Sequence, residues 1–216
     1  APVPADRRVR MAFIGCGTQG FRQLLPALEH PDVHIVAVCD PMRRSGEYPD
    51  YGNQELNNKI RKFLKDPDWA KGAPGALCGR EPGQEIVRRH YAAMGAAGPG
   101  GECRAYADFR ELLEREKELD AVYIMTPDHL HAVIAIRAMR RGLHAITHKP
   151  ISNVLSEVRA ARDTARRTGA ATHLFCASGS ANGATLREWI EAGAIGPVRE
   201  VHNWSSRPFW PQGMTE

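Results

Sequence analysis

Three glycines near the N-terminus have the spacing of a phosphate-binding turn. Gly15, Gly17 and Gly20 form the pattern G-x-G-x-x-G at the end of an apolar run, residues 9–15. The first glycine allows a tight turn, the second lets a pyrophosphate approach the backbone, and the third lets a helix pack closely on the strand. A helix that begins here offers free N–H groups and a partial positive charge to phosphates. The residues expected to contact such a ligand are Gly15, Cys16, Gly17, Thr18, Gln19 and Gly20.

Asp40 stands where a dinucleotide-binding unit carries its ribose-binding acid. It follows a second apolar run, residues 33–39, which a helix to about residue 30 connects to the first. The strand, turn, helix and acid together favour dinucleotide binding, whereas the glycines by themselves are a weak signal. Asp40 favours NAD, because its charge would repel the 2′-phosphate of NADP. Arg43 and Arg44 could pair with that phosphate, so NADP stays open as the less favoured cofactor.

Composition bounds the class of protein. The 216 residues suffice for one domain and the start of a second, at roughly 150 residues per domain. A content of 43% hydrophobic and 25% charged residues is typical of a globular chain. The net charge of +4 comes from arginines scattered along predicted helices, so we expect no nucleic-acid partner. No apolar run approaches the roughly 20 residues of a membrane span, so we expect no membrane association.

The cysteines and the first residues carry little functional information. The five cysteines lack paired spacing, which argues against a disulfide framework, and no C-x-x-C suggests zinc. His129, His131 and His148 have no evident carboxylate to complete a ligand set, so we expect no metal site. The start at Ala1, within a proline-containing stretch, fits a cytoplasmic protein or a periplasmic one after removal of an export signal.

Alternating strands and helices predict an α/β fold, namely a Rossmann-type doubly wound parallel sheet. After Asp40 the pattern is interrupted, because residues 42–101 are too many for an ordinary strand–helix connection. We interpret them as an insertion with two helices, at residues 53–64 and 83–94. The further strands are expected at residues 103–106, 121–125, 143–147 and 171–176, and the further helices at 109–116, 130–141 and 153–168.

Three segments are expected along the chain. Residues 1–8 form a tail, and residues 9–176 form the NAD(P)-binding domain. Residues 177–216 are predicted to hold a linker helix, at 184–192, and the first strand of a second α/β domain with an open antiparallel sheet, at 198–206.

Polar residues follow two of the predicted strands. Thr126 and Pro127 come after residues 121–125, and His148 and Lys149 come after residues 143–147. The carboxyl ends of parallel strands share one edge of the sheet, where open α/β sheets bind ligands. We therefore regard Lys149 as a candidate catalytic residue rather than an ordinary surface lysine. His148, next to it, is a candidate for contact with the cofactor or the reacting groups.

The same residues resemble a known family signature. The pattern T-P-x-x-x-H … A-x-x-x-G-x-H … E-K-P of the Gfo/Idh/MocA (glucose–fructose oxidoreductase/inositol dehydrogenase) family is matched in order and spacing by Thr126, Pro127, His131, Ala138, Gly142, His144, Lys149 and Pro150. The resemblance runs from residue 9 to about residue 208. It implies a Rossmann domain followed by a substrate domain, and NAD(P)-dependent hydride transfer at a sugar or polyol carbon.

The resemblance also implies roles for particular residues. Lys149 would point at the reacting hydroxyl, and its bond to Pro150 would be cis. Thr126, Pro127 and His131 would line the cofactor near the nicotinamide. Apart from the resemblance, we regard the neighbouring His129 as a candidate contact or an ordinary surface residue at the start of a helix. The complete protein would form a homo-oligomer through the sheet of its second domain.

Two departures from the family pattern matter. The glutamate of E-K-P is His148 here, which removes a fixed negative charge but keeps a hydrogen-bonding group next to Lys149. The D-x-x-x-H motif that supplies the family's general base is absent after Lys149. We therefore expect a chain that lacks most of its substrate domain. An NAD-dependent glycoside hydrolase using transient oxidation at C3 and elimination, and a non-catalytic nucleotide-binding module, remain as alternatives.

Overall fold

The computed structural model describes residues 8–50, 54–95, 102–175 and 181–202. The chain divides into two compact units, Ala1–Cys176 and Ala177–Glu216, which are described separately. Within the described ranges, no helix has the length and apolar character that a membrane crossing requires.

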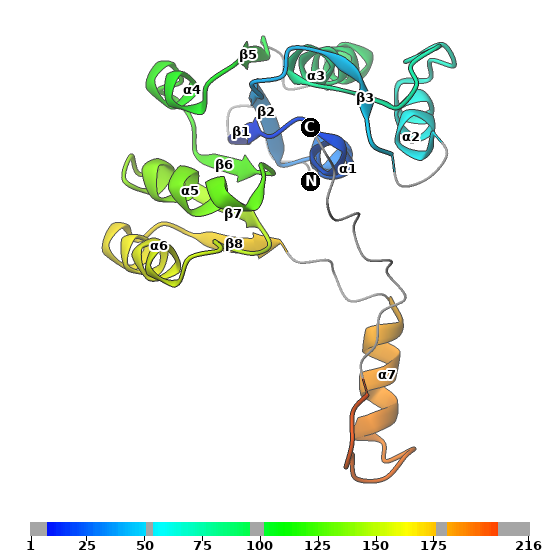
Figure 1. Ribbon diagram of the computed structural model, residues 1–216, viewed down its shortest axis with the longest axis vertical. Coiled ribbons are helices and arrows are strands. Elements are labelled where there is room, and N and C mark those ends of the chain that lie inside the picture. Colours follow the sequence, from blue (N-terminus) through cyan, green and yellow to red (C-terminus); the bar gives the residue numbers. More distant parts are fainter. Residues whose placement is uncertain (1–7, 51–53, 96–101, 176–180, 203–216) are drawn as a thin grey trace, which may run out of the picture. The chain divides into compact units, whose positions relative to one another are not determined.

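The first unit is built on a parallel sheet with the strand order β5-β2-β1-β6-β7-β8 (Figure 1). The strands are β1 (Val9–Ile14), β2 (Val33–Cys39), β5 (Arg104–Tyr106), β6 (Ala121–Ile124), β7 (His144–His148) and β8 (Thr172–Phe175). The order reverses between β1 and β6, which is where open α/β sheets bind ligands. The predicted Rossmann-type sheet is therefore confirmed.

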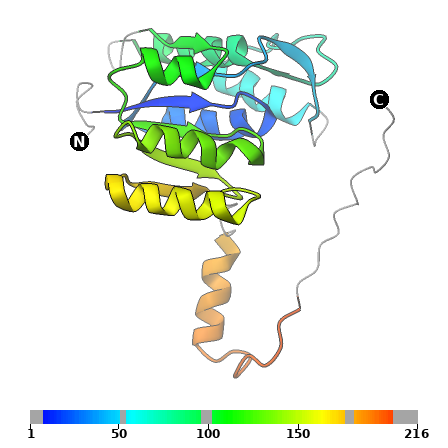
Figure 2. The same cartoon turned by 60° about the vertical axis from the view of Figure 1, so that its left-hand side comes forward.

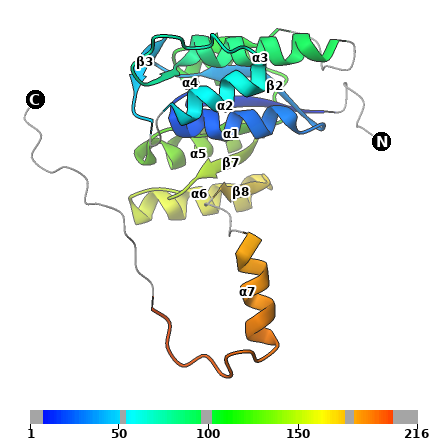
Figure 3. The same cartoon turned by 90° about the vertical axis from the view of Figure 1, so that its right-hand side faces the viewer.

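Helices cover both faces of this sheet. Figure 3 shows α1 (Thr18–Glu29), α2 (Glu55–Leu64) and α3 (Arg80–Met94) on one face. Figure 2 shows α4 (Phe109–Arg115), α5 (His131–Met139) and α6 (Leu155–Thr168) on the other. Strand residues alternate between the two hydrophobic cores: Phe13 packs on the α1 side, and its neighbours Ala12 and Ile14 pack on the α5 side. This double burial explains why the central strands are continuous apolar runs.

The insertion after β2 folds into the same unit. Its predicted helices are α2 and α3, but it also contains β3 (Ser45–Tyr48) and β4 (Ala76–Cys78), an antiparallel pair that the sequence analysis missed. The buried Asn57 joins α2 to β4, because its side chain donates to the carbonyl of Gly75 (2.9 Å) and accepts from the N–H of Leu77 (3.1 Å). These strands, of four and three residues, are too short to show a period-two pattern.

The second unit contains α7 (Ala181–Glu191), close to the predicted linker helix. The strand predicted from residue 198 is not formed in residues 198–202, and residues 203–206 lie outside the described part. Apolar and polar side chains alternate in this segment, but a strand also needs hydrogen-bonding neighbours, and residues 198–202 have none among the described residues.

The close packing of α1 on β1 gives the first testable prediction. A β-carbon at Gly20 would collide with the carbonyl oxygen of Gly15, a backbone atom that cannot turn aside as a flexible side chain could. We expect Gly20→Ala to lower the free energy of unfolding by about 1–3 kcal/mol or more, measured by urea denaturation. Gln19→Ala, at an exposed position in the same helical turn, is the control and should change it by less than about 0.5 kcal/mol. Equal stability of the two variants would contradict the packing argument.

Candidate functional site

The turn after β1 lies directly against the turn after β6. Gly15 has a φ of +105°, and a β-carbon there would lie 2.5 Å from the carbonyl carbon of Met125 and 2.8 Å from the nitrogen of Thr126. Only glycine fits this conformation and this spacing. The first glycine of the motif therefore brings the carboxyl ends of β1 and β6 together, in addition to allowing the turn.

The N-terminus of α1 suits an anion. Its first helical hydrogen bond runs from the N–H of Phe21 to the carbonyl of Gly17 (2.9 Å), and no side chain caps this end. The N–H groups of Thr18, Gln19 and Gly20 precede that bond and have no acceptor within the helix. They point out of the helix start, where phosphate binding is favoured.

Asp40 is both a candidate ribose ligand and an anchor. Its side chain is nearly buried, with Oδ2 accepting from the N–H of Cys16 (2.7 Å) and Oδ1 accepting from the N–H of Met42 (2.8 Å). Burial raises the pKa of Asp40, while these two N–H groups and the nearby Arg80 act in the opposite direction. Each carboxylate oxygen can accept a second hydrogen bond, so ribose binding remains compatible with the anchoring role.

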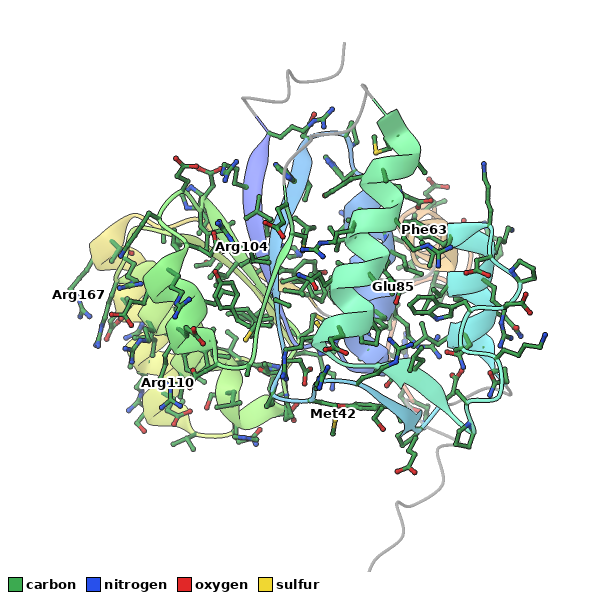
Figure 4. The ribbon with its side chains drawn as sticks, turned by 90° about the horizontal axis from the view of Figure 1, so that it is seen from above. Met42, Phe63, Glu85, Arg104, Arg110 and Arg167 are labelled. Carbon is green, nitrogen blue, oxygen red and sulfur yellow. The ribbon has the colours of Figure 1, made fainter. Side chains whose placement is uncertain are left out.

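Arg43 and Arg44, the two residues that could bind the 2′-phosphate of NADP, each form an ion pair with a glutamate of α3. Arg43 Nε lies 2.6 Å from Glu81 Oε1, and Arg44 Nη1 lies 3.8 Å from Glu85 Oε2. Figure 4 shows Glu85 on α3, with Met42 in the loop near the start of that helix. Both arginine side chains are well exposed, so the pairs are weak. Glu81 and Glu85 nevertheless place negative charge beside the two arginines that a 2′-phosphate would need.

His131 connects two turns at the carboxyl edge. Its ring is fully buried, with Nε2 2.7 Å from the carbonyl oxygen of Thr126 and Nδ1 2.6 Å from that of Pro150. Both nitrogens therefore have backbone partners, and the residue supports the site instead of offering a free nitrogen to a cofactor. The hydroxyl of Thr126 is buried and has no hydrogen-bond partner among the described residues. That orphaned group suits a ligand hydroxyl or amide.

The segment after β7 presents Lys149 at this edge. The Lys149–Pro150 peptide is cis, as predicted, and the Lys149 side chain is exposed. The ring of His148 stacks on Phe175, with centroids 5.7 Å apart. Burial lowers the pKa of His148, and the charge of Lys149 acts in the same direction. Since the ordinary value is about 6.5, His148 is neutral at pH 7 and can accept or donate a hydrogen bond beside Lys149.

The remaining predicted residues are placed less specifically. Pro127 and His129 are exposed at the start of the short 3-10 helix η3 (Asp128–Leu130). Cys16 is buried, and burial raises the pKa of its thiol well above the ordinary value. Its N–H donates to Asp40 and its carbonyl accepts from the N–H of Gly79, so Cys16 holds the turn in place. Among the described residues, no group of three or more potential ligands could hold a metal ion.

Two residues of this region were missed by the sequence analysis. Arg80 Nη1 donates to the carbonyls of Asp40 (3.2 Å) and Pro41 (2.8 Å), and Tyr48 lies next to Gly17. Both belong to the insertion, which follows no motif. A tyrosine and an arginine in a long loop carry no signal of their own, so only the folded chain reveals their positions.

Residues 83–175 match the model of the family GFO_IDH_MocA, described as an oxidoreductase family with an NAD-binding Rossmann fold. This match confirms the predicted NAD-binding fold and the predicted family resemblance.

Two curated relatives illustrate the range of activities. The dTDP-3,4-didehydro-2,6-dideoxy-alpha-D-glucose 3-reductase of Streptomyces violaceoruber is 36% identical over 124 residues, covering 56% of this chain and 35% of the relative. A glycosyl hydrolase family 109 protein of Shewanella sp. (strain MR-4) is 26% identical over 165 residues, covering 76% of this chain and 28% of the relative. The chain thus matches about a third of the length of these relatives.

A solved structure shares the fold. Scyllo-inositol dehydrogenase from Lactobacillus casei, with bound cofactor NAD(H) and scyllo-inositol, superposes with a TM-score of 0.56 at 14% identity. The match covers 88% of this chain and 42% of that one.

The position of His131 gives the second testable prediction. In His131→Gln, a flexible amide replaces the rigid ring whose two nitrogens lie against the two carbonyls, and it cannot keep both contacts in that geometry. We expect the free energy of unfolding to fall by about 1–3 kcal/mol, measured by urea denaturation. His129→Gln is the matched control at an exposed position and should have an effect below about 0.5 kcal/mol. Comparable stability of both variants would show that His131 does not hold the two turns.

Proposed function

We propose that this chain is a member of the Gfo/Idh/MocA oxidoreductase family and carries the NAD-binding part of an enzyme that transfers a hydride between nicotinamide and a sugar or polyol carbon. The observation that carries the proposal is the continuity of the carboxyl edge. Asp40 holds the turn after β1, Gly15 of that turn lies against Thr126, and His131 joins Thr126 to Pro150. A ribose-binding acid and a candidate catalytic lysine thus belong to one connected surface.

Each part of this surface suits one part of NAD. The start of α1, at Thr18–Gly20, would bind the pyrophosphate, and Asp40 would bind the adenosine ribose. The orphaned Thr126 hydroxyl and the neutral His148 would bind polar groups of the nicotinamide half. NAD supplies the hydride acceptor when bound. Lys149 would orient and polarise the substrate hydroxyl through its charge or a proton-transfer chain.

The substrate class is supported by the relatives. The Streptomyces protein is a reductase of a dTDP-linked sugar, and the Lactobacillus structure holds a cyclic polyol. Since the chain matches about a third of the curated relatives' length, we place the remaining substrate contacts, the general base and any homo-oligomer interface in residues beyond the matched region.

A redox-assisted glycoside hydrolase is the second candidate. It is supported by the family 109 relative, whose match covers 76% of this chain. Both chemistries would use the same cofactor surface. In the full-length protein, net NADH formation supports the dehydrogenase, and glycoside cleavage without net NADH supports the hydrolase. Binding of NAD with neither reaction supports a non-catalytic module.

Cofactor choice gives the third testable prediction. We expect NAD to bind at least about tenfold more tightly than NADP, by calorimetry, because Asp40 repels a 2′-phosphate and the nearby arginines are paired. Asp40→Ala should weaken NAD far more than NADP, on the scale of about 1.5–3 kcal/mol for a charged hydrogen bond. NADP as the better ligand of the unmodified protein would contradict this prediction.

A second carboxylate separates this effect from a loss of stability. Asp120 also accepts a backbone N–H, that of Arg10 (2.7 Å), but at the opposite edge of the sheet. Asp120→Ala should lower the melting temperature and leave the ratio of NAD to NADP affinity unchanged. A changed ratio in this control would mean that the ratio reports stability.

Lys149 gives the fourth testable prediction, for the full-length protein. Lys149→Met keeps the length of the side chain but removes its charge and donor. Single-turnover hydride transfer should slow by about two to four decades, while NAD affinity changes by less than about tenfold. Lys117→Met, at an exposed position after α4, is the control and should leave both unchanged. Unchanged hydride transfer in Lys149→Met would remove this lysine from the mechanism.

A further inference from the structure

We propose that Tyr48, contributed by the insertion, is a further cofactor-binding residue whose hydroxyl donates a hydrogen bond to the pyrophosphate of NAD. This inference rests on the proposed function, because it needs NAD at the start of α1. It assigns a binding role to the antiparallel strand pair β3 and β4, which lies outside the glycine motif.

Tyr48 lies where the pyrophosphate is expected. A β-carbon built on Gly17 would be 3.3 Å from Cε1 and 3.8 Å from Cδ1 of the Tyr48 ring. Gly17 is the second glycine of the motif, the position at which the missing side chain lets a pyrophosphate approach the backbone. The Tyr48 ring therefore lies directly beside Gly17, close enough to crowd a β-carbon there. A phosphate that approaches the Gly17 backbone must pass next to this ring.

The ring is held in place by the fold. Tyr48 of β3 pairs with Ala76 of β4, and a β-carbon at Gly75 would collide with the Tyr48 carbonyl oxygen. Its side chain is half-buried against the core on the α1 side of the sheet. β3 lies on the same side of the sheet as α1 and α3 (Figure 1). A residue fixed in this way loses little conformational freedom on binding a ligand.

The insertion is also tied to α1 itself. Arg22 of α1 pairs with Asp50 (3.2 Å), two residues after Tyr48, and with Glu55 at the start of α2 (3.0 Å). The Arg22 and Asp50 side chains are largely buried, which makes this pair less screened than one on the surface. The helix that presents the proposed phosphate site, α1, is therefore connected by ion pairs to the chain that follows β3.

The hydroxyl is available and has suitable chemistry. Among the described residues, the Tyr48 hydroxyl has no hydrogen-bond partner. Burial raises the pKa of Tyr48 to about 12, with Asp40, Cys78 and Cys16 acting in the same direction. A phenol that stays neutral is a hydrogen-bond donor, and an anionic phosphate oxygen is the stronger kind of acceptor for it.

The test measures binding without turnover. Calorimetry would compare NAD, ADP-ribose and adenosine on the unmodified protein and on Tyr48→Phe, which removes only the hydroxyl. We expect the Kd of NAD and of ADP-ribose to rise about tenfold or more, the scale of a hydrogen bond to a charged group, and the Kd of adenosine to stay the same. Unchanged binding of ADP-ribose and NAD would overturn the proposal.

Two further measurements make the outcome unambiguous. Tyr91→Phe is the matched control, because its hydroxyl hydrogen bonds to the N–H of Ile35 (2.8 Å) near the other end of β2. It should lower the melting temperature without changing any Kd. A Tyr48→Phe variant that loses melting temperature without NAD present, but no affinity, would assign Tyr48 to packing and overturn its binding role. If the unmodified protein binds neither NAD nor ADP-ribose, the proposed function fails first, and that result is distinct from failure at Tyr48.

Discussion

The buried carboxylate of Asp40 is the interaction on which this edge of the molecule depends. One oxygen accepts the N–H of Cys16 in the glycine turn, and the other accepts the N–H of Met42 after β2. Burial disfavours the charge, and the two N–H groups and Arg80 offset that cost. The carbonyl of Cys16 in turn accepts from the N–H of Gly79 at the start of α3 (2.9 Å). Asp40 and Cys16 together thus connect the glycine turn, the end of β2 and the insertion.

The second half of the edge is held by backbone contacts that only small or buried residues permit. Gly15 brings the turn after β1 against Thr126, and the fully buried His131 joins Thr126 to Pro150. The backbone at Lys149 is therefore held in a defined position relative to the glycine turn, although the lysine side chain itself is flexible. Preorganisation of this kind is what a hydride-transfer site requires, since small displacements of the reacting groups are costly.

The insertion changes what the Rossmann unit can recognise. Its helix α3 contains Glu81 and Glu85, which pair with the arginines of the loop after β2. Its strand β3 places Tyr48 beside the glycine turn. In the proposed enzyme, cofactor selectivity would thus be shared between the common βαβ unit and a segment without a motif. The same segment contributes a large part of the core on the α1 side, including Leu56, Ile60 and Ile86. Its structural and binding roles are therefore linked.

The sequence by itself determined the sheet, the helices around it and the position of the glycine turn, because burial on both faces imposes apolar runs and a tight strand-to-helix turn imposes glycines at set positions. Strands such as β1 and β6 and the insertion helices could be predicted within a few residues for this reason. Tertiary structure decided the rest. The short strand β3 gains its hydrogen bonds only from β4, which follows it in the chain after the whole of α2. Residues 198–202 have no such partner among the residues that the structure describes. The role of His131 was decided in the same way, since its two acceptors come from turns that only the folded sheet brings together.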